Sequence, residues 1–150
     1  MKLNIIFFLG IVVLGGLSCT DSGKNQLKVE DDYFINPIFS SGSNPNALFY
    51  GGKYYYTHET NDMIILWETN DITDMGSAVC KEVWRPTDPK SMHNLWAPEI
   101  HRINDKWYIY YAADDGNTDN HQIYVLENDA RTPMEGTFKQ KGPIMTRQIA

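Results

Sequence analysis

An indole and a carboxylate flank a proline near the middle of the chain, where Trp96 and Glu99 stand on either side of Ala97-Pro98. Because proline fixes its own φ and disfavours a helical residue before it, we expect Ala97 to be extended and both side chains to point in fixed directions at a strand entrance. A flat indole beside a carboxylate suits the face and the hydroxyl groups of a sugar ring. The structural alternative is that Trp96 packs in a core and Glu99 caps a turn.

A hairpin pattern follows this pair directly, and a similar pattern occurs earlier in the chain. Gly51-Gly52 and Asn104-Asp105 tolerate the positive φ that a two-residue turn demands, and runs rich in Tyr, Ile and Trp flank both turns. The two patterns predict two antiparallel strand pairs, the second of which would position Trp96 and Glu99.

The two hairpins belong to an internal repeat. Lys53 and Lys106 begin the second strand of each copy and lie 53 positions apart, whereas Glu68 and Glu127 lie 59 positions apart, so the second copy has a loop six residues longer. Further strands are predicted at 81–85 and 137–140, which gives about four strands per copy. A period of this size is typical of β-propellers, and no helix is predicted after the N-terminal segment.

Four segments of the chain together carry a resemblance to a known family. They are 34–38, 51–57, 95–111 with its Trp-Ala-Pro-Glu run, and 112–117 followed by Asn120-His121. These segments resemble glycoside hydrolase family 43, and the likeness extends over residues 34 to 142. The resemblance implies an all-β, five-bladed β-propeller, of which this chain holds about the first two blades. It also implies cleavage of arabinose- or xylose-containing plant polysaccharides with inversion.

Inverting hydrolysis needs one carboxylate as general base and one carboxylic acid as proton donor, held roughly 6.5 to 9.5 Å apart. The resemblance places the base on an Asp-Pro pair just ahead of the first hairpin, where this chain has Asn44-Pro45. An amide cannot accept the proton from water at useful rates. The resemblance places the Glu that acts as the acid, and the Asp that adjusts the pKa of that Glu, after Ala150. We therefore predict a truncated glycosidase that is inactive as given. The alternatives are a non-catalytic carbohydrate-binding pseudoenzyme fragment and a remnant without any ligand.

Three residues are predicted to contact a saccharide, namely Trp96, Glu99 and His121. For Glu99 a hydrogen bond to a sugar hydroxyl is expected rather than proton transfer, because the resemblance assigns the acid elsewhere. The alternative for His121 is a simple hydrogen bond within its loop. Trp67 and Trp84 lie on strand-like runs, where core packing is the expectation.

Two further patterns could suggest metal sites, and both are incomplete. The acids of 115–119 alternate like the start of a calcium loop, but the sixth position lacks Gly and Leu126 stands where the twelfth needs Glu. His58-Glu59 begins like a zinc-protease motif, but Asp62 stands where the second His belongs. We therefore predict no metal and no cofactor.

The N-terminal residues predict export and lipidation. Residues 1–18 combine a positive start with an apolar run that is too short to span a membrane, as in a lipoprotein signal peptide. The run Gly16-Leu17-Ser18-Cys19 looks like a bacterial lipobox, so Cys19 is predicted to carry lipid; the alternative is an ordinary signal peptide. Residues 19–32 are predicted to be a flexible tether and 33–150 the partial propeller domain.

The net charge limits the classes of binding partner, and the cysteine count limits the possible disulfides. The net charge of −6 and the pI near 5.1 argue against nucleic acid. We expect a protein of the bacterial cell envelope that meets the membrane only through its N-terminal lipid and binds plant polysaccharide or oligosaccharide. If Cys19 carries lipid, Cys80 is left without an intramolecular partner. Burial of Cys80 as a small apolar residue is then expected, with a reactive thiol as the alternative.

Overall fold

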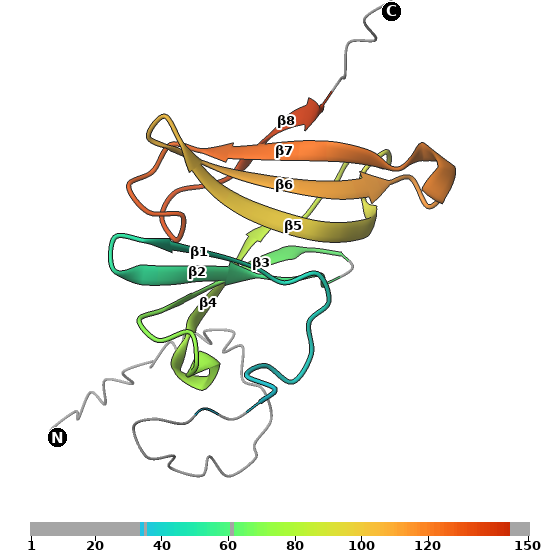
Figure 1. Ribbon diagram of the computed structural model, residues 1–150. Helices are drawn as coiled ribbons and strands as arrows, with labels where there is room; N and C mark the ends of the chain where they lie inside the picture. Colours follow the sequence, from blue (N-terminus) through green and yellow to red (C-terminus); the bar gives the residue numbers. More distant parts are fainter. Residues whose placement is uncertain (1–33, 35, 61, 145–150) are drawn as a thin grey trace, which may run out of the picture.

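Two four-stranded antiparallel β-sheets make up the described part of the chain (Figure 1). The computed structural model describes residues 34, 36–60 and 62–144. The predicted signal peptide, tether and lipidation site at Cys19 therefore lie outside the described residues. The first sheet contains β1 (Asn46–Tyr50), β2 (Lys53–Thr57), β3 (Ile64–Thr69) and β4 (Val79–Trp84). The second contains β5 (His93–Ile103), β6 (Lys106–Asp114), β7 (Gln122–Asn128) and β8 (Lys139–Pro143).

The sheets confirm an all-β chain with four strands in each copy of the repeat. In each sheet the spatial order of the strands is their order along the chain. The last strand begins later than predicted because Phe138, only 2% exposed, enters the core instead of pairing. Among residues 36–60 and 62–144 the only helical elements are two short 3₁₀ turns, η1 (Met75–Ser77) and η2 (Thr118–Asn120).

Both predicted hairpin turns are present. Gly51 and Gly52 have φ of 62° and 82°, and Asn104 and Asp105 have φ of 48° and 62°. The residues that flank each turn pair directly across the hairpin. Two consecutive residues with positive φ give a turn whose twist matches that of the flanking strands, so the turn chemistry sets the register of both hairpins.

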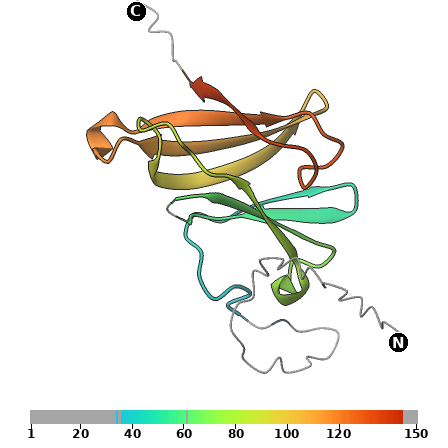
Figure 2. The same ribbon diagram turned by 180° about the vertical axis from the view of Figure 1, so that it is seen from behind.

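One hydrophobic core joins the two sheets, which Figure 2 shows as two layers from behind. Trp107, Ile109 and Tyr111 alternate along β6 and are at most 1% exposed, and Tyr55 and Leu66 meet them from the first sheet. Because successive strand residues face opposite sides, this alternation directs one whole face of the second sheet toward the first. Full burial of one such side chain contributes about 1.5–3 kcal/mol, so these contacts hold the sheets together.

A second, smaller cluster covers the other face of the first sheet. It contains the buried residues Tyr56, Trp67 and Met75, with Phe39 packed against them. Trp84 is half-buried against the core between the sheets. The prediction that Trp67 and Trp84 serve packing is therefore confirmed.

The internal repeat is visible as two equivalent ion pairs. Lys53 binds Glu68 in the first sheet, and Lys106 binds Glu127 at 3.2 Å in the second. Tyr108 donates its hydroxyl to Glu127 at 3.0 Å, which raises the pKa of that tyrosine. Positions 53 or 59 residues apart thus occupy corresponding places in the two sheets.

Cys80 departs from its prediction. It lies on β4 and is disulfide-bonded, so the expectation of a lone buried thiol is wrong. The expectation rested on lipidation of Cys19, which would leave Cys80 without an intramolecular partner.

Within 36–60 and 62–144, no helix is long and apolar enough to cross a membrane.

Candidate functional site

One end of the two sheets gathers the predicted site residues. β1 and β5 begin at this end, and β2 and β6 finish there (Figure 1). Asn44 lies two residues before β1, Trp96 lies near the start of β5, and His121 follows η2 between β6 and β7. The amide of Ile100 donates to the Asn46 side-chain oxygen at 3.0 Å, which fixes β5 beside β1.

A β-bulge at Ala97 orients the indole and the carboxylate. Trp96 pairs with Ala112 and Glu99 pairs with Tyr110. The paired residues are three positions apart on β5 but two positions apart on β6, so β5 contains one extra residue between them. Ala97 has φ of 45°, so the predicted extended conformation before Pro98 is wrong. The preference of a residue before proline is outweighed here by strand pairing on both sides of the extra residue.

The bulge puts both predicted side chains on the same face. Residues three apart in a regular strand point to opposite faces, because side chains alternate with a period of two. With one extra residue between them, Trp96 and Glu99 are both exposed, while Leu95 and Pro98 are buried on the opposite face. The site lies within β5 and not at its entrance, and its geometry depends on the bulge.

Trp96 and His121 are in contact. Their ring centroids are 4.5 Å apart with an interplanar angle of 37°, and the indole remains 39% exposed. Glu99 belongs to the same face but pairs with His101, whose Nε2 lies 3.3 Å from Glu99 Oε2. The structure thus brings two of the three predicted contact residues together and leaves the third as an exposed neighbour on the same strand.

Sequence reasoning missed Asp114, which is the buried carboxylate behind this surface. It ends β6 with 0% exposure and accepts hydrogen bonds from Asn94 Nδ2 at 3.0 Å, Gly116 N at 2.8 Å and His121 Nδ1 at 2.8 Å. Burial acts to raise the pKa of Asp114, but the hydrogen bonds from His121, Asn94 and Gly116 outweigh it and hold the pKa below its ordinary value. The alternation along β6 gives no signal for it, because the buried phase contains Trp107, Ile109, Tyr111 and Ala113 and Asp114 falls in the other phase.

Asn44, at the position that the resemblance assigns to the general base, is bonded to a carboxylate. Its Nδ2 donates to Glu59 Oε2 at 2.8 Å, and Ser43 Oγ donates to the same oxygen at 3.2 Å. Glu59 N in turn donates to Ser43 O at 3.0 Å. Sequence reasoning did not anticipate Glu59, because its pairing depends on the return of the chain after β2.

The residues that had suggested metal sites serve other purposes. Asp115 and Asn117 accept backbone hydrogen bonds from Asn117 and Asp119 respectively, as expected for a turn-rich loop. His58 is 5% exposed and stacks on Trp67 at 4.7 Å. Across 36–60 and 62–144 no group of three His, Cys, Asp or Glu residues is placed to hold a metal ion.

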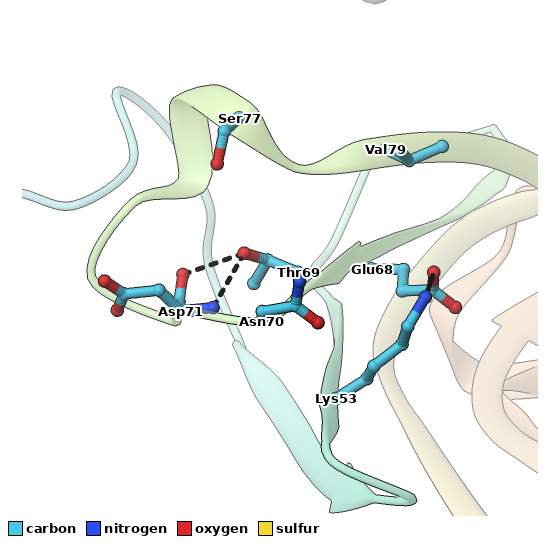
Figure 3. Close-up of a pocket in the computed structure, with 7 residues that line it drawn as sticks. All are labelled: Lys53, Glu68, Thr69, Asn70, Asp71, Ser77 and Val79. Atoms are coloured by element: carbon cyan, nitrogen blue, oxygen red, sulfur yellow. Dashed lines mark hydrogen bonds and ion pairs between the residues drawn. The ribbon is translucent and has the colours of Figure 1, made fainter.

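Two surface hollows lie at the opposite end of the sheets. One, of about 210 Å³, is lined by the Lys53–Glu68 pair and by the segment from Thr69 to Val79 (Figure 3). The other, of about 530 Å³, lies between the first hairpin, Arg102 and the loop before β8. Neither includes Trp96 or His121, so the candidate site is separate from both hollows.

Two adjoining four-stranded antiparallel sheets that repeat one pattern, with aromatic and polar side chains at one end, define blades of a β-propeller. The sequence profile of glycosyl hydrolases family 43 matches residues 34–149, and the chain belongs to this family. The predicted family is therefore confirmed, together with the predicted fold, an all-β portion of the family's five-bladed propeller.

Arabinose-active enzymes are among the similar proteins. The extracellular exo-α-(1→5)-L-arabinofuranosidase of Streptomyces chartreusis is 34% identical over 119 residues, which cover 75% of this chain and 36% of that one. The α-L-arabinofuranosidase B of Pyricularia oryzae is 29% identical over 142 residues, which cover 90% of this chain and 29% of that one. The crystal structure of the α-L-arabinofuranosidase from Lactobacillus brevis matches with a TM-score of 0.69 and 26% identity, over 76% of this chain and 39% of that one. The chain spans about a third of the length of these proteins.

Proposed function

We propose that the chain supplies an arabinose-binding surface to a glycosidase acting on arabinose- or xylose-containing plant polysaccharides. The observation that carries this proposal is the bulge at Ala97, which puts Trp96 and Glu99 on one exposed face. An exposed indole offers a flat apolar surface to a sugar ring, and a carboxylate accepts hydrogen bonds from its hydroxyl groups. The arabinofuranosidases of Streptomyces chartreusis and Lactobacillus brevis, to which the chain is similar, support arabinose as the sugar.

Binding is tested first with arabino-oligosaccharides and isothermal titration calorimetry. We expect Trp96→Ala to weaken binding at least about tenfold, because truncation of an aromatic anchor removes most of its contact with a ligand. Phe49→Ala is the matched control, since Phe49 is 59% exposed on β1 at the other end of the sheets. Equal affinities of the two variants would contradict the proposed surface.

A second candidate function is binding without turnover. It is favoured by Asn44, whose amide donates to Glu59 and has no basic lone pair with which to deprotonate water. Release of the chromophore from aryl α-L-arabinofuranosides and aryl β-xylosides distinguishes the two functions. Turnover with inversion supports the hydrolase, whereas saccharide binding without turnover supports the pseudoenzyme.

We also propose that the protein works at the bacterial cell envelope, anchored by lipid on Cys19. The proposal draws on the predicted lipobox and on the extracellular relative from Streptomyces chartreusis. Because the chain has two cysteines, the anchor requires that the disulfide at Cys80 is absent from the processed protein. Intact mass of the protein isolated from bacterial membranes tests the anchor: a diacylglycerol adduct supports it, and a mass lower than that of the reduced chain by two hydrogen atoms contradicts it.

A further inference from the structure

The fully buried carboxylate of Asp114 is held by three donors. Asn94 Nδ2 lies 3.0 Å from each of its oxygens, Gly116 N lies 2.8 Å from Oδ1, and His121 Nδ1 lies 2.8 Å from Oδ2. A buried carboxylate without such partners costs several kcal/mol, so this arrangement stabilises Asp114 in its ionised form. Two of the donors depend on unusual backbone, since Asn94 has φ of 51° and Gly116 has φ of 99°.

The carboxylate determines the state of the neighbouring imidazole. An ionised carboxylate only accepts hydrogen bonds, so Nδ1 of His121 must carry the proton that it shares with Asp114. Nε2 of the same ring is buried and has no hydrogen-bond partner among the described residues. The ring is therefore held from one side by a charge-assisted hydrogen bond and is free to be a neutral acceptor on the other.

The held imidazole lies against Trp96. The two ring centroids are 4.5 Å apart, and Trp96 is the more exposed of the two rings. An exposed indole on a strand otherwise samples several rotamers, and ordering it on binding would cost free energy. A neighbour that is itself fixed removes part of that cost.

We infer that Asp114 is a positioning residue, which fixes the imidazole of His121 and through it the indole of Trp96 as a preformed platform for an arabinose ring. The role in saccharide binding rests on the proposed function. The ordering of the His121 and Trp96 rings by Asp114 does not depend on a ligand and can be measured without one.

The ligand-free experiment compares Asp114→Asn with Asp119→Asn, which makes the same change at an exposed position of the same loop. In ¹⁵N spectra of the histidine rings we expect His121 to be the Nδ1–H tautomer in the unchanged protein and in Asp119→Asn. In Asp114→Asn we expect that signature to be lost and acrylamide quenching of Trp96 fluorescence to rise. A Trp96→Phe background isolates the indole concerned among the four tryptophans. Unchanged tautomer and quenching in Asp114→Asn would overturn the inference.

The binding experiment uses arabino-oligosaccharides in the same calorimeter. We expect Asp114→Asn to bind about tenfold more weakly, the equivalent of losing one hydrogen bond to a charged group, while Asp119→Asn binds like the unchanged protein. If His121 and Trp96 respond as expected but the unchanged protein binds no arabinoside, the proposed function fails and the positioning role stands.

A second variant covers the outcome in which Asp114→Asn does not fold. His121→Asn keeps an N–H donor for Asp114 but removes the ring beside Trp96. We expect this variant to retain the melting temperature, with increased quenching of Trp96 and weakened saccharide binding. Retention of full affinity and of the original quenching would count against the inference.

Discussion

His58 is buried and His121 is half-buried, and the two rings have different kinds of partner. His121 shares a proton with the carboxylate of Asp114. His58 is surrounded by rings, with Trp67 at 4.7 Å and Phe39 at 5.2 Å, and its Nδ1 has no hydrogen-bond partner among the described residues. Burial lowers the pKa of His58 from its ordinary value of 6.5. A proton on this ring therefore opposes folding.

We predict that His58→Phe makes the free energy of unfolding less sensitive to pH between 7 and 5. The folded pKa of His58 lies below the unfolded one, so the unfolded chain binds more protons as the pH falls below about 6.5, and stability decreases there. One such group changes the stability by at most about 1.4 kcal/mol per pH unit. Urea unfolding at a series of pH values measures the slope.

His93→Gln is the matched control for that measurement, because it removes a histidine that is exposed on β5 and lies outside the aromatic cluster around His58. An identical slope in His58→Phe and in the unchanged protein would show that His58 keeps its ordinary pKa in the fold.

Only part of the candidate site was accessible from the sequence. Trp96 and His121 were each predicted to contact a saccharide, because both belong to recognisable segments, and this stays a prediction; their contact with one another was not predicted. Asp114 and Glu59 were missed, since their roles depend on residues 20 and 15 positions away, Asn94 and Asn44, that only the folded sheets bring near. Local spacing carries no information on such pairs.

At the scale of elements, the β5 bulge is the feature that most affects the site. Ala97 adopts φ of 45°, a conformation that costs a residue with a Cβ roughly 1–2 kcal/mol. The hairpins were predicted because the residues of the turns themselves, Gly51-Gly52 and Asn104-Asp105, are of types that tolerate a positive φ. The bulge was not predicted, because it arises from the registers on both sides of Ala97, which no neighbouring residue specifies.

We predict opposite outcomes for two changes at this position. Ala97→Gly should keep saccharide binding and raise stability by about 0.5–1 kcal/mol, because glycine adopts a positive φ without the steric cost. Ala97→Val should weaken binding, because a β-branched residue disfavours a positive φ, and in a regular strand Trp96 and Glu99, three positions apart, would point to opposite faces. Calorimetry with arabino-oligosaccharides and urea unfolding test both. Undiminished binding in Ala97→Val would show that the bulge is dispensable.

At the scale of the whole molecule, the second sheet has two faces in different environments. One face packs on the first sheet, while the other leaves Ile123 53% exposed and Tyr108 and Val125 half-buried. The repeat equates Ile123 with Ile64, which is 1% exposed between the sheets. The outer face of the second sheet thus carries the same types of side chain as the face of the first sheet that packs against the second.

We predict that this face drives concentration-dependent self-association of the isolated chain, and that Ile123→Lys reduces it. An exposed apolar sheet face loses unfavourable contact with water when it is covered, at about 25 cal/mol per Å² of apolar area, and a charge on that face makes covering it costly. Phe49→Lys is the control, because Phe49 is 59% exposed on the first sheet, away from that face. Sedimentation velocity across a concentration series measures the effect. If both variants associate as the unchanged chain does, the contact lies elsewhere; if only Ile123→Lys remains monomeric, the outer face of β6 and β7 is the surface that associates.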